Sequence, residues 1–158
     1  MRAGAGVILA AAGLLGASHA HAQLGYLWTY EELLQKADVA VIADCMDTVD
    51  TGWVRPHPEL TPASVVHELR TSFRVSAVLK GRRSDAAGGK LRLRHFRYTA
   101  DALRGGLVNG GTWLSLRRGG SYLLFLADGG DGVYEPLSGH TFPDDSVFLL
   151  ARASRRGR

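Results

Sequence analysis

The chain has a single cysteine, Cys45, among its 158 residues, so no disulfide can form within it. This excludes the small disulfide-rich scaffolds of secreted proteins, which depend on several such bridges. No internal repeat is visible, and after residue 22 no apolar run approaches the roughly 20 residues of a membrane-spanning helix. Because Cys45 lies in the apolar run 39–46, we expect it to be a small buried side chain.

Motifs of the common enzyme classes are absent as well. The sequence has no HExxH zinc pair and no GxSxG nucleophile elbow, and its glycine pairs do not precede helices as a phosphate-binding loop requires. His140 with Asp144 or Asp145 offers metal-ligand atoms, and Ser138 stands two residues before His140, but this stretch has the composition of an ordinary loop. We therefore expect no enzyme, no metal and no cofactor. A small metal-dependent or serine hydrolase of the cell envelope is the alternative interpretation.

The first 22 residues have the pattern of an export signal. Arg2 gives a positive start, residues 7–17 form an apolar run too short to cross a bilayer, and Ala20-His21-Ala22 offers the small-x-small triplet that a signal peptidase cleaves. We predict a signal peptide over residues 1–22 with cleavage near Ala22, and hence a secreted or periplasmic protein with no membrane span after cleavage. An uncleaved N-terminal anchor is the alternative.

Two local patterns predict the main elements of residues 23–151. Thr29-Tyr30-Glu31-Glu32 has the form of a capping box and predicts a short helix that ends near Ala37. In residues 65–80, mostly apolar side chains at the odd positions alternate with mostly polar or charged ones at the even positions. This alternation over sixteen positions predicts one long strand, with His67 on its buried face. Further strands are predicted over 38–50, 90–94, 112–116, 122–126, 133–137 and 146–150, with a loop at 51–63 and a hairpin turn at 128–132.

The order of these elements predicts the fold class. Several strands, one short helix, many glycines and no alternation of strands with helices indicate an all-β protein. A long second strand that must bend favours a small closed OB-like Greek-key barrel of five to seven strands over a sandwich. We expect this barrel to occupy residues 23–151 and the tail 152–158, which carries four arginines, to be disordered.

Several segments resemble a known architecture. They are Glu32-Leu33-Leu34 with Ala37-Asp38-Val39, Phe73-Arg74-Val75 with Val78-Leu79-Lys80-Gly81, and Tyr122-Leu123-Leu124-Phe125-Leu126 followed by Gly132-Val133-Tyr134 and Ser138-Gly139. Over most of residues 29–150 the chain is similar to bacterial exported OB-fold proteins related to the netrin-like domain of tissue inhibitors of metalloproteinases. Those inhibitors chelate zinc through an N-terminal cysteine and carry disulfides, both missing here. The resemblance therefore implies a fold and transfers no residue role.

Charge is distributed unevenly along the chain. Residues 54–118 contain thirteen basic side chains against four acidic ones, whereas residues 119–151 contain five acids and no base. Within the basic third, charged residues alternate with apolar ones in two neighbouring predicted strands, so their side chains should point to solvent. If these strands pair, one sheet face carries the candidate contact residues Arg70, Arg74, Lys90, Arg92 and Arg94, together with Lys80.

This face leads to the expected function. Arginine binds carboxylates and phosphates through a two-pronged fork, so the face suits an anionic protein, an envelope polysaccharide or a lipid headgroup. The predicted export argues against nucleic acid as the partner. We expect a non-enzymatic binding module, and a structural subunit of an envelope assembly is a second alternative. The interpretation without a ligand is a solvated basic face in which Glu68 reduces the repulsion between the cations.

Overall fold

The computed structural model describes residues 28–59, 65–81, 88–104 and 113–151. The predicted signal peptide and the arginine-rich tail lie outside these residues. Within the described part of the chain, no helix combines the length and the apolar character needed to cross a membrane.

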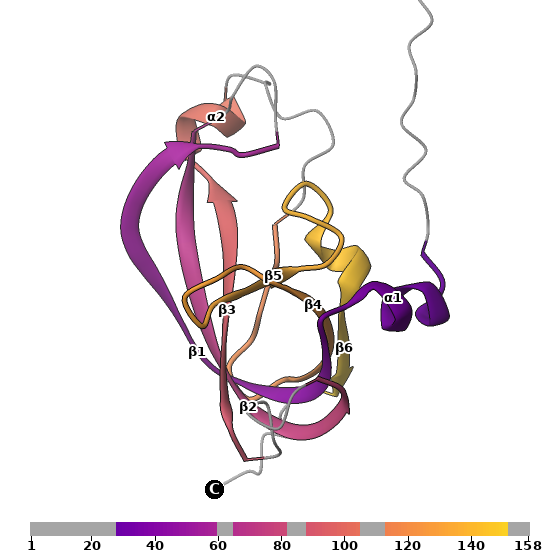
Figure 1. Cartoon of the computed structure of the whole chain (residues 1–158). Coiled ribbons are helices and arrows are strands. Elements are labelled where there is room, and N and C mark those ends of the chain that lie inside the picture. The colour runs from indigo at the N-terminus through magenta and orange to yellow at the C-terminus, as the bar shows by residue number, and fades with distance from the viewer. Residues whose placement is uncertain (1–27, 60–64, 82–87, 105–112, 152–158) are drawn as a thin grey trace, which may run out of the picture.

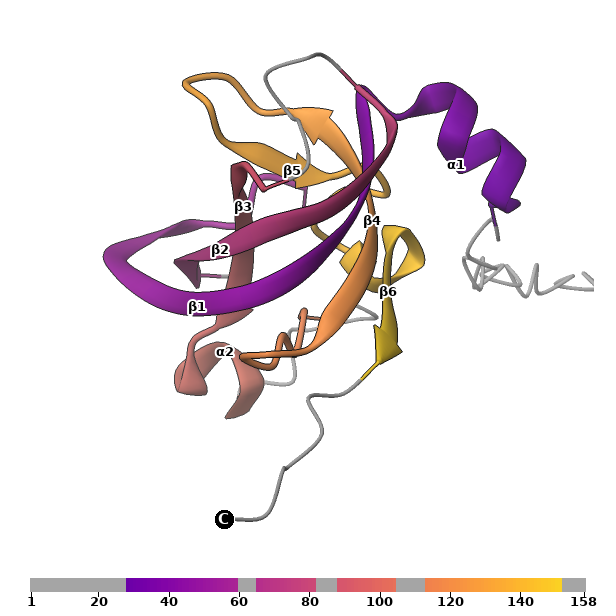
Figure 2. The same cartoon turned by 90° about the horizontal axis from the view of Figure 1, so that it is seen from below.

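The described elements are strands with short helical segments between them (Figures 1 and 2). In chain order they are α1 (Tyr30–Lys36), β1 (Val39–Pro56), β2 (Val65–Lys80), β3 (Lys90–Tyr98), α2 (Ala100–Arg104), β4 (Ser121–Asp128), β5 (Tyr134–Pro136), the 3-10 turn η2 (Pro143–Ser146) and β6 (Val147–Ala151).

Helix α1 begins at the predicted capping box. The Thr29 side chain accepts the Glu32 backbone N–H, and the Glu32 carboxylate accepts the Thr29 N–H at 2.8 Å. A helix of seven residues is not stable alone, so packing must hold it in place. Leu33 supplies that packing, because it is fully buried in a cluster with Ala40 of β1 and Phe125 of β4.

The strands close into a ring. β1, β2 and β3 form an antiparallel meander, β3 pairs in parallel with β5, β5 pairs with β4, and β4 returns to β1. β6 adds to β4 outside this ring. The expected all-β fold, a small closed barrel with one short N-terminal helix, is confirmed, and α2 adds only five residues.

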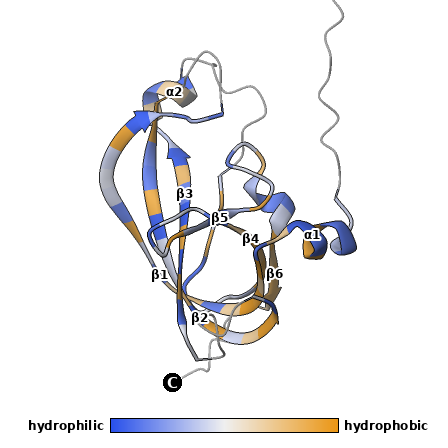
Figure 3. Ribbon diagram, in the orientation of Figure 1, coloured by the Kyte–Doolittle hydropathy of each residue, from blue (hydrophilic) through white to orange (hydrophobic). Residues whose placement is uncertain are grey.

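The interior of the ring is the main core. Phe73 of β2, Leu93 of β3 and Leu124 of β4 are fully buried there, and Cys45 is buried beside them as predicted. Along β2 and β3 the hydropathy alternates from residue to residue, which matches a strand with one face inside (Figure 3). A smaller cluster of Val66, Phe96, Tyr98 and Ala102 covers the far end of the same two strands.

Two local predictions are wrong, and a third is confirmed but too short. β1 continues to Pro56, through the segment 51–56 that we expected to be a loop, because β2 supplies hydrogen-bond partners up to the pair Pro56 and Val65. β3 likewise extends beyond residue 94 to Tyr98. Residues 113–116, by contrast, form no strand.

His67 also differs from its prediction. Its side chain is 31% exposed and its Nδ1 lies 3.5 Å from the Asp50 carboxylate, so it faces outward. The buried histidine of this sheet is His95, which is 1% exposed. The physical reason is packing at this end of the sheet, where the segment after β1 covers the opposite face of β2 and β3 and His57 contacts Phe96 and Tyr98.

Candidate functional site

The register of β2 and β3 brings the predicted basic residues together. Arg70 lies opposite Arg94, Ser72 opposite Arg92, and Arg74 opposite Lys90. Residues directly opposite on an antiparallel pair project to the same face, so the five candidates form three successive rows. Their separation along the strands is about 6.8 Å per row, the distance that two residues of a strand cover.

Three of the five cations on this face form no ion pair within the described part of the chain. Arg74, Lys90 and Arg92 are exposed, and none of them makes an ion pair with any residue that the structure describes. Like charges directly opposite each other destabilise a sheet, by roughly 0.2–1 kcal/mol for one pair. The pair of Arg74 and Lys90 is therefore a local cost to folding, which Asp44, directly opposite Arg74 on β1, offsets in part without forming an ion pair.

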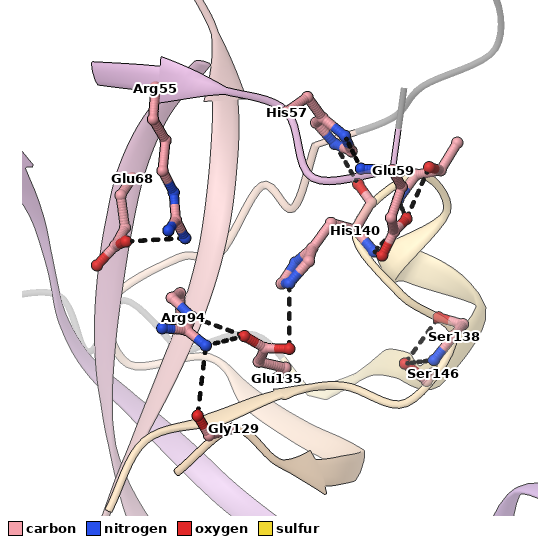
Figure 4. Close-up of polar contacts among 11 residues, drawn as sticks. Arg55, His57, Glu59, Glu68, Arg94, Gly129, Glu135, Ser138, His140 and Ser146 are labelled. Atoms are coloured by element: carbon pink, nitrogen blue, oxygen red, sulfur yellow. Dashed lines mark hydrogen bonds and ion pairs between the residues drawn. The ribbon is translucent and has the colours of Figure 1, made fainter. Parts of the chain in front are cut away.

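Arg94 differs from the expectation that it projects to solvent. Its Nε donates to Glu135 Oε1 at 2.7 Å, and its Nη2 contacts the same oxygen and also donates to the Gly129 carbonyl at 3.4 Å (Figure 4). Its side chain is only 24% exposed. The parallel pairing of β3 with β5 explains the contact, because it places Glu135 beside Arg94. We leave Arg94 out of the contact surface.

Arg70 and Lys80 are also engaged, although less completely. Arg70 remains 46% exposed but pairs at 3.1 Å with Glu68, which also binds Arg55 at 3.1 Å. Lys80 donates to the carbonyls of Leu34 and Gln35 at the end of α1. A cation there satisfies carbonyls that the helix leaves open. The basic face is thus Arg74, Lys90 and Arg92, with Arg70 at its margin.

An open hollow lies at the edge of the basic face. It has a volume of about 240 Å³ and is lined by Asp44, Cys45, Met46, Arg74, Arg118 and Gly119. Arg74 therefore belongs to both the face and the hollow. Arg118 was not predicted, because it lies in a turn far from β2 in sequence.

A second polar cluster lies at the other end of β3. The Glu59 carboxylate accepts hydrogen bonds from the backbone N–H groups of His140 and Thr141 and from the Thr141 hydroxyl at 2.7–2.9 Å (Figure 4). Gly139 permits this approach, because a Cβ there would lie 2.8 Å from a Glu59 oxygen. These bonds hold the segment after β1 against the loop before η2.

The ionisation of this cluster follows its burial. Burial lowers the pKa of His140 although Glu135 and Glu59 act in the opposite direction. Burial also lowers the pKa of His57, whose Nδ1 accepts the Glu59 N–H. For Glu59, burial raises the pKa, but the hydrogen bonds from His140 and Thr141 outweigh it and the net pKa is lowered. With His57 and His140 neutral and Glu59 ionised, this cluster is a structural clamp between the two loops.

The residues of the hydrolase alternative do not form a catalytic arrangement. The Ser138 hydroxyl donates to the Phe142 carbonyl at 2.7 Å and shares a hydrogen bond with Ser146, whereas His140 Nε2 lies 3.4 Å from Glu135. A serine nucleophile needs a base within hydrogen-bond reach. Within the described ranges no three His, Cys, Asp or Glu side chains group as metal ligands.

Comparison with known proteins adds no identity. No protein-family model matches the chain, and a search of curated proteins finds no similar one.

Proposed function

We propose that this protein is an exported, non-enzymatic binding module that docks an acidic protein segment on the face of Arg74, Lys90 and Arg92. The observation that carries the proposal is the register of β2 and β3, which sets Arg74 opposite Lys90, while neither side chain forms an ion pair with an acid of the described ranges. An internal acid would be the simplest relief of their repulsion, as Glu135 is for Arg94. A bound carboxylate supplies the same relief from outside.

The spacing of the charges favours an extended peptide among anionic partners. Alternate side chains of an extended chain recur about every 6.8 Å, which is also the distance between successive rows of the face. A segment with glutamate or aspartate at every second position can therefore place one carboxylate on each row. The proposed export rests on the N-terminal pattern alone.

The test is the affinity for two acidic decapeptides of equal charge. One has glutamate at every second position with threonine between, and the other has five consecutive glutamates followed by five threonines. We expect the alternating peptide to bind more tightly, with an affinity that falls as salt rises, because exposed charges are screened over about 10 Å at 0.1 M ionic strength. Equal affinity for the two peptides would contradict the extended partner.

Matched variants separate the face from net charge. Arg74→Gln with Arg92→Gln removes two charges from the face, and Arg97→Gln with Arg104→Gln removes two charges elsewhere. We expect the first pair to lower affinity about tenfold or more, because charge-assisted contacts are each worth about 1.5–3 kcal/mol when direct. The second pair should change it little. Equal losses would show attraction by net charge only.

Two further probes decide between classes of partner. A sulfated glycan and vesicles of anionic lipid are titrated against the same variants. Tighter binding of either, with the same dependence on Arg74 and Arg92, would retain the basic face and overturn the acidic peptide as its partner. Absence of binding by every probe would overturn the proposed function.

A further inference from the structure

We propose that the hollow beside the basic face is a subsite for one carboxylate side chain of the docked partner, held between Arg74 and Arg118. The inference rests on the proposed function and names the place where that partner is anchored. It follows from the turn before β4, from the balance of charge in the hollow and from its size.

The turn at residues 117–120 fixes Arg118 against β1. The Gly119 N–H donates to the Cys45 carbonyl at 2.7 Å, and the Cys45 N–H donates to the Gly120 carbonyl at 2.8 Å. The turn is closed by the Gly120 N–H, which donates to the Arg117 carbonyl at 2.9 Å. Gly119 has a φ of +76°, which a side chain would strain. The backbone that carries Arg118 is therefore held rigidly beside the hollow.

The partner strand β2 brings the second guanidinium. Arg74 lies opposite Asp44 in the register of β1 and β2, so the two strands meet at the hollow. β1 has an irregularity in register between Cys45 and Asp47 at this point. Such bulges bend a strand and redirect side chains, and they are frequent next to binding sites.

Asp44 does not neutralise these arginines by direct contact. Its carboxylate accepts the Ser76 hydroxyl at 3.1 Å and also the Ser121 hydroxyl, and it makes no ion pair with Arg74 or Arg118. Two cations and one anion leave the lining with one net positive charge. A carboxylate carries one negative charge, which matches the net charge of the lining. A phosphate monoester near pH 7 carries about 1.5 to 2 negative charges, which exceeds it.

The size of the hollow fits a group and not a whole small molecule. Its volume of about 240 Å³ is below the roughly 300–1,000 Å³ of ordinary small-molecule pockets. Met46 and Cys45 give it apolar walls for the methylene groups that carry a glutamate carboxylate.

The test uses the full chain and capped amino acids. N-acetyl-glutamic acid α-methylamide is the probe, the capped glutamine is its neutral control, and capped phosphoserine is the dianionic comparison. Side-chain Nε–Hε NMR signals report on each arginine. We expect the glutamate probe to shift the signals of Arg74 and Arg118 saturably in the millimolar range, and to do so more strongly than phosphoserine, whereas the glutamine probe leaves them unchanged.

Neighbouring residues supply the control variants. Arg118→Gln should weaken the glutamate probe at least about tenfold. Arg117→Gln removes an equal charge one position away, on a residue that does not line the hollow, and should leave binding within about twofold of the unaltered protein. Backbone amide spectra of both variants verify that the fold is retained.

The outcomes separate this inference from the proposed function. If the alternating decapeptide docks through Arg74 and Arg92 but Arg118→Gln and Arg117→Gln have equal effects, the subsite is wrong and the face stands. If the glutamate probe fails to shift Arg118 at all, the subsite is likewise wrong. If the glutamate probe binds as expected and the decapeptides do not, the hollow is a carboxylate site and the extended docking surface is wrong.

Discussion

The buried His95 should make the stability of the barrel depend on pH. His95 Nε2 shares a hydrogen bond with the Thr71 hydroxyl at 2.8 Å, and Thr71 shares another with Thr48 at 2.7 Å. Its Nδ1 is buried and has no hydrogen-bond partner among the residues that the structure describes. Burial, and then repulsion from His140 when that ring is also protonated, lowers the pKa of His95 from 6.5 to about 4.

The direction and size of this pH dependence follow from the difference between the pKa of His95 in the folded and the unfolded chain. Between about pH 6.5 and pH 4 the unfolded chain holds a proton on His95 that the folded protein does not hold, so stability falls as pH falls. A difference of about 2.5 pKa units corresponds to about 3 kcal/mol at 1.36 kcal/mol per unit. That is a large part of the roughly 5–15 kcal/mol that stabilises a typical domain.

Urea unfolding of the unaltered protein and of His95→Gln, at several pH values between 7 and 4, measures this contribution. Glutamine keeps an amide that can bond to Thr71 and has no proton to gain. Because the pKa values of His57 and His140 are also lowered, both proteins should lose stability in acid. The unaltered protein should lose about 3 kcal/mol more than the variant. Equal losses would refute the burial argument for His95.

Two further substitutions test the packing of the fold. Thr29→Ala removes the cap of α1 and should lower the free energy of unfolding by about 1 kcal/mol in urea titration, and an unchanged midpoint would show that the cap contributes nothing. Leu93→Ala opens a cavity at a fully buried position of the ring and should cost about 2–5 kcal/mol, whereas a cost below 1 kcal/mol would place Leu93 outside the core.

Local signals in the sequence predicted the elements whose partners are local. The capping box located α1, and sixteen residues of alternation located β2 from Val65 to Lys80. The same alternation placed Arg74, Arg92 and Lys90 correctly on one exposed face. These features are determined by neighbours a few positions away, which a single sequence contains.

Features that depend on distant contacts could not be predicted in this way. The exterior face of β2 and β3 becomes covered at one end because the segment after β1 packs there, with His57 against Phe96 and Tyr98. For this reason a uniform alternation misplaced His67. Arg94 is neutralised by Glu135, which lies 41 positions away, and no local pattern in the sequence predicts that pairing.

Arg118 was missed for a related reason. Its place beside Arg74 depends on two backbone hydrogen bonds between the turn before β4 and Cys45 of β1. An alternation of apolar and polar residues identifies strands, but it carries no information about the strands that a turn contacts. The paired glycines at 119 and 120 are typical of a turn, but they do not indicate which strand that turn contacts.

The most direct test of the central claim is where an acidic peptide binds. Backbone amide shifts of the labelled protein are followed while the alternating glutamate decapeptide is added. We expect the changes to be concentrated on residues 70–74 and 90–92 and at Arg118. Changes confined to the clamp of residues 57–59 and 138–141, or spread evenly over the surface, would contradict it.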